Sequence, residues 1–258
     1  MSNYPEWDSC AVNPDLYIEK YTDYIKTNEL REILDGKTVA IVGPSSHING
    51  QNLGNYIDSF DVVVRVGFLE EPTEIAMEDY GSRTDIIIHS FNSFEIPVAS
   101  ENIGYLSRCK HIICGMVSSD FINDHEFFFD SLREIGIKVQ NVEDSYLYGF
   151  FRRVGTICNL GTVGIEIILK YEIKSLFVTG INFYNMGRYG KVYNEEYFDV
   201  VSSKMGIYKN ELNGIVTGIS ARSDLHSQKP QIEHFKSVVK SDDRVLLDKY
   251  LEENLFVS

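Results

Sequence analysis

The sequence predicts an α/β protein with a Rossmann-like, mostly parallel, doubly wound sheet and a lid-like insertion. Three observations support this fold class. Short, continuously apolar runs rich in Val and Ile recur along the chain, as expected of strands buried on both faces. Segments with helical periodicity lie between these runs. The segment 182–225 holds many Tyr, Gly and Asn residues and no long apolar run, which indicates a lid rather than core.

The apolar runs give the expected strands. Five are strong candidates, and they occupy 39–42, 61–66, 85–89, 111–116 and 175–179. Two weaker candidates occupy 137–142 and 244–247. Strands that alternate with helices pair in parallel, because each crossover returns the chain to the same edge of the sheet.

Helical periodicity predicts helices over 15–34, 120–135, 161–171 and 230–240. Gly36 and Gly136 are placed to end the first two, because glycine readily adopts the left-handed conformation that closes a helix. At 258 residues the chain fits one domain. We therefore predict a single domain over 1–258, with an N-terminal helical segment at 1–36 and the lid at 182–225.

The composition argues against several classes of partner. The net charge of -14 disfavours nucleic acid and anionic membrane surfaces. No apolar run reaches the roughly 20 residues that a membrane-spanning helix needs. Cys10, Cys109, Cys114 and Cys158 lie far apart without metal-binding spacing, so we expect reduced thiols. These features predict a cytoplasmic protein without a transmembrane segment; the oligomeric state stays open, and a homo-oligomer is compatible with the sequence.

Polar residues follow several of the predicted strands. The loop Gly43-Pro44-Ser45-Ser46, with Asn49 behind it, comes after the first strand. Ser90 and Asn92 follow the third strand, and the fifth runs into the lid. The carboxyl ends of parallel strands share one edge, where such sheets bind ligands. These groups suit a nucleotide and its phosphate; the alternative is an ordinary polar turn between strand and helix.

Arg65 is a charge inside the second apolar run. A buried guanidinium needs a partner. We expect that partner to be a carboxylate such as Asp61 or Asp85, with contact to a bound ligand as the less favoured alternative.

The histidines divide by context. His111 begins a predicted strand and His125 precedes three phenylalanines closely, so both are interpreted as structural. His226 directly precedes Ser227, a candidate N-cap with Pro230 early in the following helix. The positive end of a helix disfavours a protonated imidazole, so His226 is a candidate general base. The alternative for His226 is a solvated surface residue.

Four motifs resemble those of a known family. The run "VAIVGPSSHINGQNLGNYIDSFDVVVRVG", followed by "DYGSRTDIIIHS", resembles the long nucleotide-binding motif of the sialyltransferases. "CNLGTVGIEIILKYEIKSLFVTGINFY" resembles their shorter second motif, and "TGINFYNMG" and "LHSQKPQIEHFKSVV" resemble segments of the bacterial enzymes. The motifs keep the family's order over 37 to about 240. The resemblance implies the sialyltransferase-like variant of the GT-A glycosyltransferase fold.

The resemblance also implies a CMP-activated sialic acid, or a related sugar acid, as donor substrate, with no metal and no cofactor. Gly43, Ser45 and Ser46 would line its phosphate and ribose. Gly161 would permit close approach of the donor, and Asn159 stands where the family's residues meet it. The full donor-binding set that we predict is Gly43, Ser45, Ser46, Asn49, Ser90, Asn92, Asn159 and Gly161.

The chain departs from the family's pattern at three positions. The family commonly has Asn where Pro44 and Gly67 stand, and a small hydroxyl residue where Leu160 stands. Either other residues replace these contacts, or the donor differs from CMP-sialic acid. The candidate replacements are Asn49, Asn52 and Asn92.

The resemblance assigns the chemistry to the lid and to the residue that follows it. His226 matches the family's catalytic base. Tyr184, with Tyr189 or Tyr193, would donate hydrogen bonds to the leaving CMP phosphate. The backbone N–H groups of the Gly43 loop would stabilise the same anion.

The predicted function is an inverting, metal-independent transfer of the sugar acid to a hydroxyl of a glycan or glycolipid acceptor. Its biological setting would be the synthesis of a surface polysaccharide or lipooligosaccharide. In the lid, Arg188 and Arg222 would meet an acidic acceptor, with solvated surface charge as the alternative.

Two other classes of function remain open. A pyrophosphokinase-like enzyme could use a similar Gly-Pro-Ser loop, but it would need Mg²⁺ and a carboxylate cluster. The candidate carboxylates are Asp58, Asp61 and Asp85. A non-catalytic nucleotide-binding protein is favoured by the departures at Pro44, Gly67 and Leu160.

Overall fold

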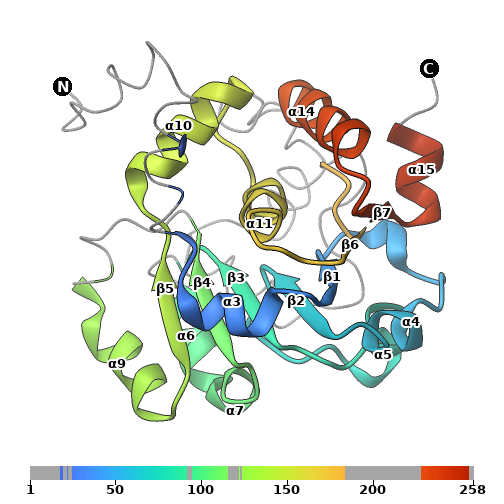
Figure 1. The fold of residues 1–258 in the computed structure, drawn as a ribbon. Coiled ribbons are helices and arrows are strands. Elements are labelled where there is room, and N and C mark those ends of the chain that lie inside the picture. The colour runs from blue at the N-terminus through green and yellow to red at the C-terminus, as the bar shows by residue number, and fades with distance from the viewer. Residues whose placement is uncertain are drawn as a thin grey trace, which may run out of the picture.

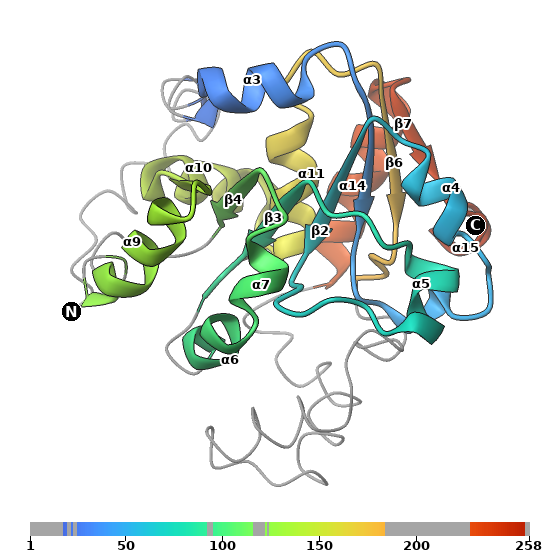
Figure 2. The same ribbon diagram turned by 90° about the horizontal axis from the view of Figure 1, so that it is seen from below.

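The computed structural model of the chain describes residues 18–19, 22, 25–91, 95–115, 122, 124–183 and 228–255. These residues form a seven-stranded sheet in the order β5-β4-β3-β2-β1-β6-β7 (Figures 1 and 2). Every pair of neighbouring strands is parallel. The predicted α/β fold with a parallel, doubly wound sheet is confirmed.

All seven predicted strands are present, within one or two residues of their predicted bounds. They are β1 (Thr38–Val42), β2 (Val62–Val66), β3 (Ile86–His89), β4 (His111–Cys114), β5 (Lys138–Asn141), β6 (Ser175–Thr179) and β7 (Val245–Leu247). Only the fourth ends clearly early. Its last pairing residue is Cys114, and the next N–H group, of Gly115, already donates to His89 as the chain turns.

Helices cover both faces of the sheet (Figure 1). One face carries α3 (Asn28–Leu34), α10 (Asp144–Val154), α11 (Leu160–Ile168) and α14 (Gln228–Ser241). The other carries α4 (Gly54–Asp58), α5 (Glu74–Tyr80), α6 (Glu95–Glu101), α7 (Ile103–Leu106) and α9 (Glu126–Glu134). Beside β7 lies α15 (Lys249–Leu255), and the one-turn 3₁₀ helix η1 (Ser46–Ile48) follows β1.

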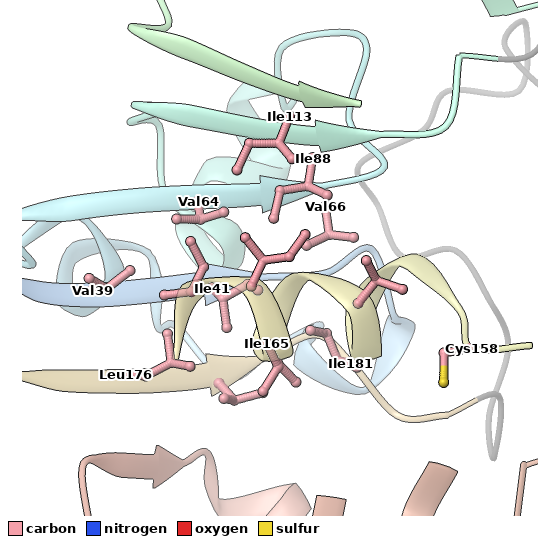
Figure 3. Close-up of a cluster of buried hydrophobic side chains, with 14 of the residues drawn as sticks. Val39, Ile41, Val64, Val66, Ile88, Ile113, Cys158, Ile165, Leu176 and Ile181 are labelled. Carbon is pink, nitrogen blue, oxygen red and sulfur yellow. The ribbon is translucent and has the colours of Figure 1, made fainter. Parts of the chain in front are cut away.

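The strands are apolar throughout because alternate residues enter different cores. Val39 and Ile41 of β1 belong to the core under α11, which Figure 3 shows. Ala40 and Val42 belong to the core under α5 to α9. Since side chains alternate across a strand, burial on both faces requires the continuous apolar pattern seen in the sequence.

The predicted helix over 15–34 is wrong in its continuity. Residues 26 and 27 are not helical, and α3 begins at Asn28. Thr27 caps it, because its hydroxyl oxygen accepts the N–H of Leu30. The predicted glycine stops are confirmed: Gly36 and Gly136 have φ angles of 71° and 88°. The predicted helix over 120–135 is interrupted: residues 122 and 124 are helical, residue 125 is not, and α9 begins at Glu126.

Two expectations from composition can be compared with the described residues. Cys109, Cys114 and Cys158 are free and buried, and burial raises the pKa of Cys109 and Cys114 to about 12, so both are thiols. Cys10 lies outside the described residues. Among the helices that the structure describes, none is long and apolar enough to cross a membrane.

Candidate functional site

Polar loops meet at the carboxyl edge of the sheet, where the strand order reverses between β1 and β6. Val42, the last residue of β1, lies opposite Thr179, the last residue of β6. From this pair, β2 to β5 extend to one side and β7 to the other. Doubly wound proteins bind ligands at such a reversal. The loop 43–52, which we call the β1 loop, begins there.

Gly43 and Gly180 hold the two strand ends together beyond the sheet. The N–H of Gly43 donates to Thr179, and that of Ser45 donates to Gly180, each over 2.9 Å. A Cβ atom on Gly43 would collide with the Gly180 oxygen, so this contact requires glycine. Pro44 has no N–H. The expectation that the backbone N–H groups of this loop stabilise a phosphate is therefore wrong at Gly43, Pro44 and Ser45.

Ile181 brings the two predicted donor motifs together. A Cβ on Gly43 would lie 2.6 Å from Cγ1 of Ile181, and a Cβ on Gly161 would lie 2.9 Å from its Cγ2. The close approach that Gly161 permits is therefore to the loop that follows β6. Donor contact at either glycine stays a prediction.

The β1 loop is fastened from beneath by the end of α5. The carboxylate of Asp79 accepts the N–H groups of Gly50 and Asn52 at 2.7 and 2.8 Å. The hydroxyl of Tyr80 lies 2.9 Å from the Ser45 carbonyl oxygen and within 3.1 Å of the side-chain oxygen of Asn49. Burial, aided by the charge of Asp79, raises the pKa of Tyr80, which stays protonated. These bonds fix the loop that carries Ser45, Ser46 and Asn49.

His47 links the β1 loop to the end of β7. Its Nδ1 lies 3.2 Å from Ser45 Oγ, and its Nε2 lies 2.8 Å from Asp248 Oδ2. Asp248 Oδ2 also accepts the hydroxyl of Thr179 at 2.6 Å, and the imidazole stacks on Tyr250 with 4.3 Å between ring centroids. Burial acts to raise the pKa of Asp248, but the bonds from His47 and Thr179 outweigh it and hold that pKa below its usual value. Since a carboxylate only accepts, Nε2 carries a proton.

The start of α11 is tied to the start of α14 by one side chain. Asn159 caps α11, and its Oδ1 accepts the Thr162 N–H at 2.8 Å. Gln231, fully buried in the first turn of α14, accepts the Asn159 N–H and the Thr162 hydroxyl, both at 2.9 Å. Asn159, predicted to bind the donor, therefore has a capping role, and the second motif directly contacts the fourth.

A buried carboxylate fixes α14 further along. Glu166 Oε1 accepts hydrogen bonds from Arg153 at 2.7 Å, Lys170 at 2.9 Å and the Tyr146 hydroxyl at 3.1 Å, while its Oε2 lies 3.8 Å from His234 Nε2. Burial acts to raise the pKa of Glu166, but His234, Lys170 and Arg153 hold it well below its usual value. The cluster joins α10, α11 and α14.

Of the remaining predicted residues, Ser46, Asn49 and Ser90 lie in the described part of the chain and the others do not. Ser46 and Asn49 are half-exposed in the β1 loop. Ser90 follows β3, which β2 separates from β1, so it lies further from the reversal. The other predicted residues, which lie outside the described part of the chain, are Asn92, Tyr184, Arg188, Tyr189, Tyr193, Arg222 and His226.

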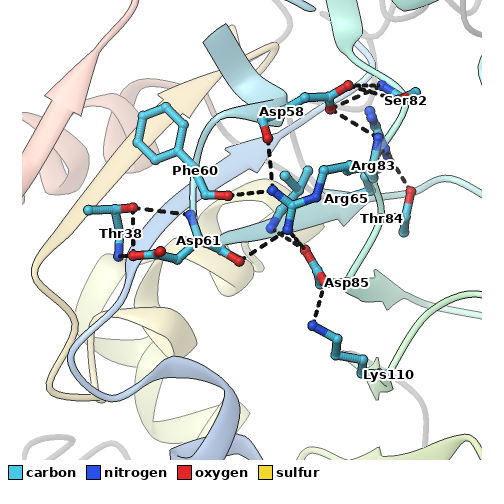
Figure 4. A network of polar contacts seen from close by, with 11 residues as sticks. Thr38, Asp58, Phe60, Asp61, Arg65, Ser82, Arg83, Thr84, Asp85 and Lys110 are labelled. Carbon is cyan, nitrogen blue, oxygen red and sulfur yellow. Dashed lines mark hydrogen bonds and ion pairs between the residues drawn. The ribbon is translucent and has the colours of Figure 1, made fainter. Parts of the chain in front are cut away.

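The carboxylates that a pyrophosphokinase would need lie at the opposite, amino edge of the sheet (Figure 4). Asp61 accepts the N–H and the hydroxyl of Thr38, at the start of β1. Asp58 accepts the N–H groups of Ser82 and Arg83. In the described part of the chain, no group of three or more His, Cys, Asp or Glu side chains could hold a metal ion. This rival function is disfavoured because its carboxylates are engaged away from the β1 loop.

Asp85 and Arg83 complete this edge. Asp85 accepts the Val63 N–H at 2.9 Å, Arg83 at 3.0 Å and Lys110 at 2.8 Å. The guanidinium of Arg83 also donates to the carbonyl oxygens of Asp58, Phe60 and Asp61. Figure 4 shows these side chains converging at the starts of β2 and β3.

Arg65 does not pair with Asp61 or Asp85, so that expectation is wrong. Its fully buried guanidinium donates to the backbone oxygens of Tyr80, Gly81 and Arg83, at 2.8 to 3.0 Å. Arg65 lies on the face covered by α5, and the end of a helix offers carbonyl groups without helical partners. Those carbonyl groups take the place of the expected carboxylate.

A separate apolar groove of about 600 Å³ lies beside β7. Tyr56, Phe177, Leu246 and Glu252 are among its lining residues. Asp248 also borders it, yet the Asp248 side chain has no exposed surface. The groove is therefore distinct from the polar groups of the β1 loop.

The fold and the polar carboxyl edge define a doubly wound, Rossmann-like α/β protein. Residues 18–114 match the profile of glycosyltransferase family 29 (sialyltransferase), which confirms the resemblance seen in the first motif. This match covers the first of the four motifs and less than half of the chain. The second, third and fourth motifs lie outside the matched residues. No curated protein sequence matches the chain.

Two solved structures are similar to the chain. A mammalian sialyltransferase, in complex with Gal-beta-1-3GalNAc-ortho-nitrophenol, has a TM-score of 0.51 and 15% identity to the chain; the match covers 95% of this chain and 85% of that one. The sialyltransferase CstII from Campylobacter jejuni, in complex with cytidine-5'-monophosphate, has a TM-score of 0.49 and 13% identity, over 83% of this chain and 79% of that one. The first likeness shows that the mammalian fold is shared.

Sequence reasoning missed three residues that organise this edge. Asp248 directly follows the weak strand candidate 244–247, and a polar residue at the end of a strand is a usable signal. His47 lies four residues after Gly43, in the quoted loop. Gln231 carried no signal, because a Gln in a helix is ordinarily solvated.

Proposed function

We propose that the chain transfers sialic acid, or a related sugar acid, from a CMP-activated donor to a glycan hydroxyl by a metal-independent, inverting displacement. The donor is a substrate, and no cofactor takes part. The acceptor is a glycan or glycolipid of a surface polysaccharide or lipooligosaccharide.

One observation carries the proposal. Gln231 bonds the first turn of α14 to the capped start of α11, at the edge where the β1 loop begins. The helix α14 starts at Gln228, two residues after His226. The candidate base therefore precedes, by two positions in the sequence, a helix end that is fixed against the second donor motif.

In the proposed reaction His226 takes the proton of the acceptor hydroxyl while that oxygen attacks the anomeric carbon. The bond from the anomeric carbon to the phosphate oxygen breaks, and CMP leaves with the electron pair. Tyr184, with Tyr189 or Tyr193, donates hydrogen bonds to the departing phosphate. These tyrosines supply more of the stabilisation of the phosphate than the sequence suggested. The N–H groups of Gly43 and Ser45 are already bonded to Thr179 and Gly180.

Recognition divides between two regions. Ser46 and Asn49, half-exposed in the fixed β1 loop, contact the nucleotide. The lid over 182–225 receives the acceptor, with Arg188 and Arg222 meeting acidic groups. Ser90 and Asn92 contribute from the end of β3.

The test combines ligand binding with turnover. CMP should stabilise the wild-type protein with EDTA present, by about 2.7 kcal/mol at 100 times its Kd, while UDP, GDP and ATP with Mg²⁺ should not. His226→Ala should lower the rate of transfer from CMP-sialic acid by about 10²- to 10⁴-fold and keep CMP binding.

His234→Ala is the matched control, because this histidine lies beside Glu166 on α14, the helix that begins two residues after His226 in the sequence. It should alter stability with little change in the rate per folded molecule. A stabilising response to ATP and Mg²⁺ alone would refute the proposal, and so would a His226→Ala protein that transfers at the wild-type rate.

A further inference from the structure

Ser45 and Ser46 are adjacent in the sequence, yet the structure gives them different surroundings. Ser45 is 3% exposed, and its hydroxyl faces His47 at 3.2 Å. Ser46 is half-exposed at the start of η1. Of the pair, only Ser46 therefore has accessible surface, and Ser45 faces the interior of the protein.

His47 and Asp248 form the interior side of the loop. Both side chains have no exposed surface. Asp248 accepts three hydrogen bonds: from His47 Nε2 at 2.8 Å, from the Thr179 hydroxyl at 2.6 Å and from the Leu251 N–H at 2.8 Å. The bond from Leu251 caps α15, because the Asp248 carboxylate accepts one of the N–H groups that have no partner within the helix at its start.

The network joins three elements at the strand reversal. The β1 loop supplies Ser45 and His47, the end of β6 supplies Thr179, and the junction of β7 with α15 supplies Asp248. Stacking on Tyr250, at an interplanar angle of 15°, fixes the plane of the imidazole. A polar side chain held at this many points has little freedom, so the loop above it is held in one position.

We propose that His47 and Asp248 are positioning residues for the nucleotide donor, and that they hold the β1 loop so that Ser46 and Asn49 face the donor while Ser45 serves as an internal anchor. The inference rests on the proposed function. It reassigns Ser45 from donor contact to framework and gives the last strand and helix a part in donor binding. Because the described members of the network lie in the β1 loop, at the ends of β6 and β7 and at the start of α15, its loss should weaken donor binding and spare the chemical step.

The test measures the Kd for CMP by calorimetry and the steady-state constants for CMP-sialic acid in four variants. His47→Leu removes both hydrogen bonds of the ring at similar volume. It should raise the donor KM and the CMP Kd by about tenfold or more and change kcat by less than about threefold. His47→Gln keeps an N–H donor for Asp248, and it should recover most of the lost affinity. Ser46→Ala should weaken CMP binding as His47→Leu does.

Asp242→Asn is the matched control. Asp242 bonds Arg244 at the entry to β7, whereas Asp248 lies at the exit of the same strand. Its replacement should alter stability and leave CMP affinity within about twofold. If His47→Leu does not fold, Asp248→Asn carries the test, because the amide oxygen can still accept from Leu251.

The outcomes separate the two proposals. A wild-type protein that does not bind CMP would overturn the proposed function and this inference with it. A wild-type protein that binds CMP, with folded His47→Leu or Asp248→Asn of unchanged affinity, would overturn the inference alone. Equal loss of kcat and of donor affinity, without rescue by His47→Gln, would also overturn it, because that pattern marks a general structural defect.

Discussion

The two edges of the sheet satisfy their polar groups in different ways. At the amino edge, Asp85, Arg83 and Lys110 bind one another and the backbone around them (Figure 4). At the carboxyl edge the partners of the β1 loop lie beneath it, in α5 and at the end of β7, and Ser46 and Asn49 stay half-exposed. The first arrangement uses its polar groups for stability, whereas the second supports a surface. Substitutions at the two edges should therefore separate stability from ligand binding.

Asp85→Ala should give the largest loss of stability. It leaves the buried Val63 N–H without its partner and removes the carboxylate that faces Arg83 and Lys110. Leaving the buried Val63 N–H unpaired and losing both cation contacts costs on the order of 2 to 3 kcal/mol in the free energy of unfolding, most of it from the N–H because the two cations are exposed. Urea unfolding measures the loss, and calorimetry should show an unchanged Kd for CMP. Lys110→Met is the control: this side chain is 60% exposed, so the loss should stay below about 1 kcal/mol. A changed CMP affinity in Asp85→Ala would break the contrast between the edges.

A second test uses His111, the first residue of β4. Burial lowers its pKa to about 4, with Lys138 acting in the same direction and Glu29 and Gln140 acting against it. The folded protein keeps this ring neutral, while the unfolded chain takes up a proton below pH 6.5. His111 should therefore lower stability as the pH falls from 6.5 toward 4, by up to about 3 kcal/mol.

His111→Leu should remove that part of the pH dependence. The measurement is urea unfolding of both proteins at several pH values between 7.5 and 4.5. The free energies of wild type and variant should diverge steadily as the pH falls, and a constant difference across this range would count against a buried neutral histidine at the amino edge.

The smallest effect on stability is expected at the carboxyl edge, from Asp79→Asn. The amide keeps one acceptor for Gly50 or Asn52 and loses the other, so the loss should be about 1 kcal/mol. The affinity for CMP should fall about three- to tenfold, because the β1 loop loses a fixed point. Calorimetry of this variant beside Asp85→Ala gives the sharpest comparison. Unchanged CMP binding in Asp79→Asn would show that the loop does not depend on α5.

The strands were predictable because burial on both faces leaves an unbroken apolar run, and β6 agrees with its predicted bounds, 175–179. Several helices were not. The helices α4 to α7 are short, so their apolar residues complete too few turns to show a period. Helix α10 differs, because its signal is present in the sequence: Tyr146, Phe150 and Val154 recur at helical spacing among its buried residues.

The candidate site was predictable only in part. The strand ends located it at the carboxyl edge, and Gly43 of the β1 loop marks a close contact, although that contact is with Gly180 and Ile181, which follow β6. The sequence could not reveal which distant residue meets which. Arg65 illustrates the limit. Its burial implied that it needs a partner, but its partners are backbone carbonyl groups at the end of α5, and every residue type carries such a group.

The bond between His47 and Asp248 spans 201 positions of the chain. A ribosome adds about 5 to 20 residues per second, so roughly 10 to 40 s pass between the synthesis of these two residues. During that time β1 to β6 can be completed in order, while the loop after the first strand still lacks its anchor. The nascent chain can therefore form β1 to β6 before the β1 loop has its partner Asp248, and the loop becomes fixed only with the last strand and helix.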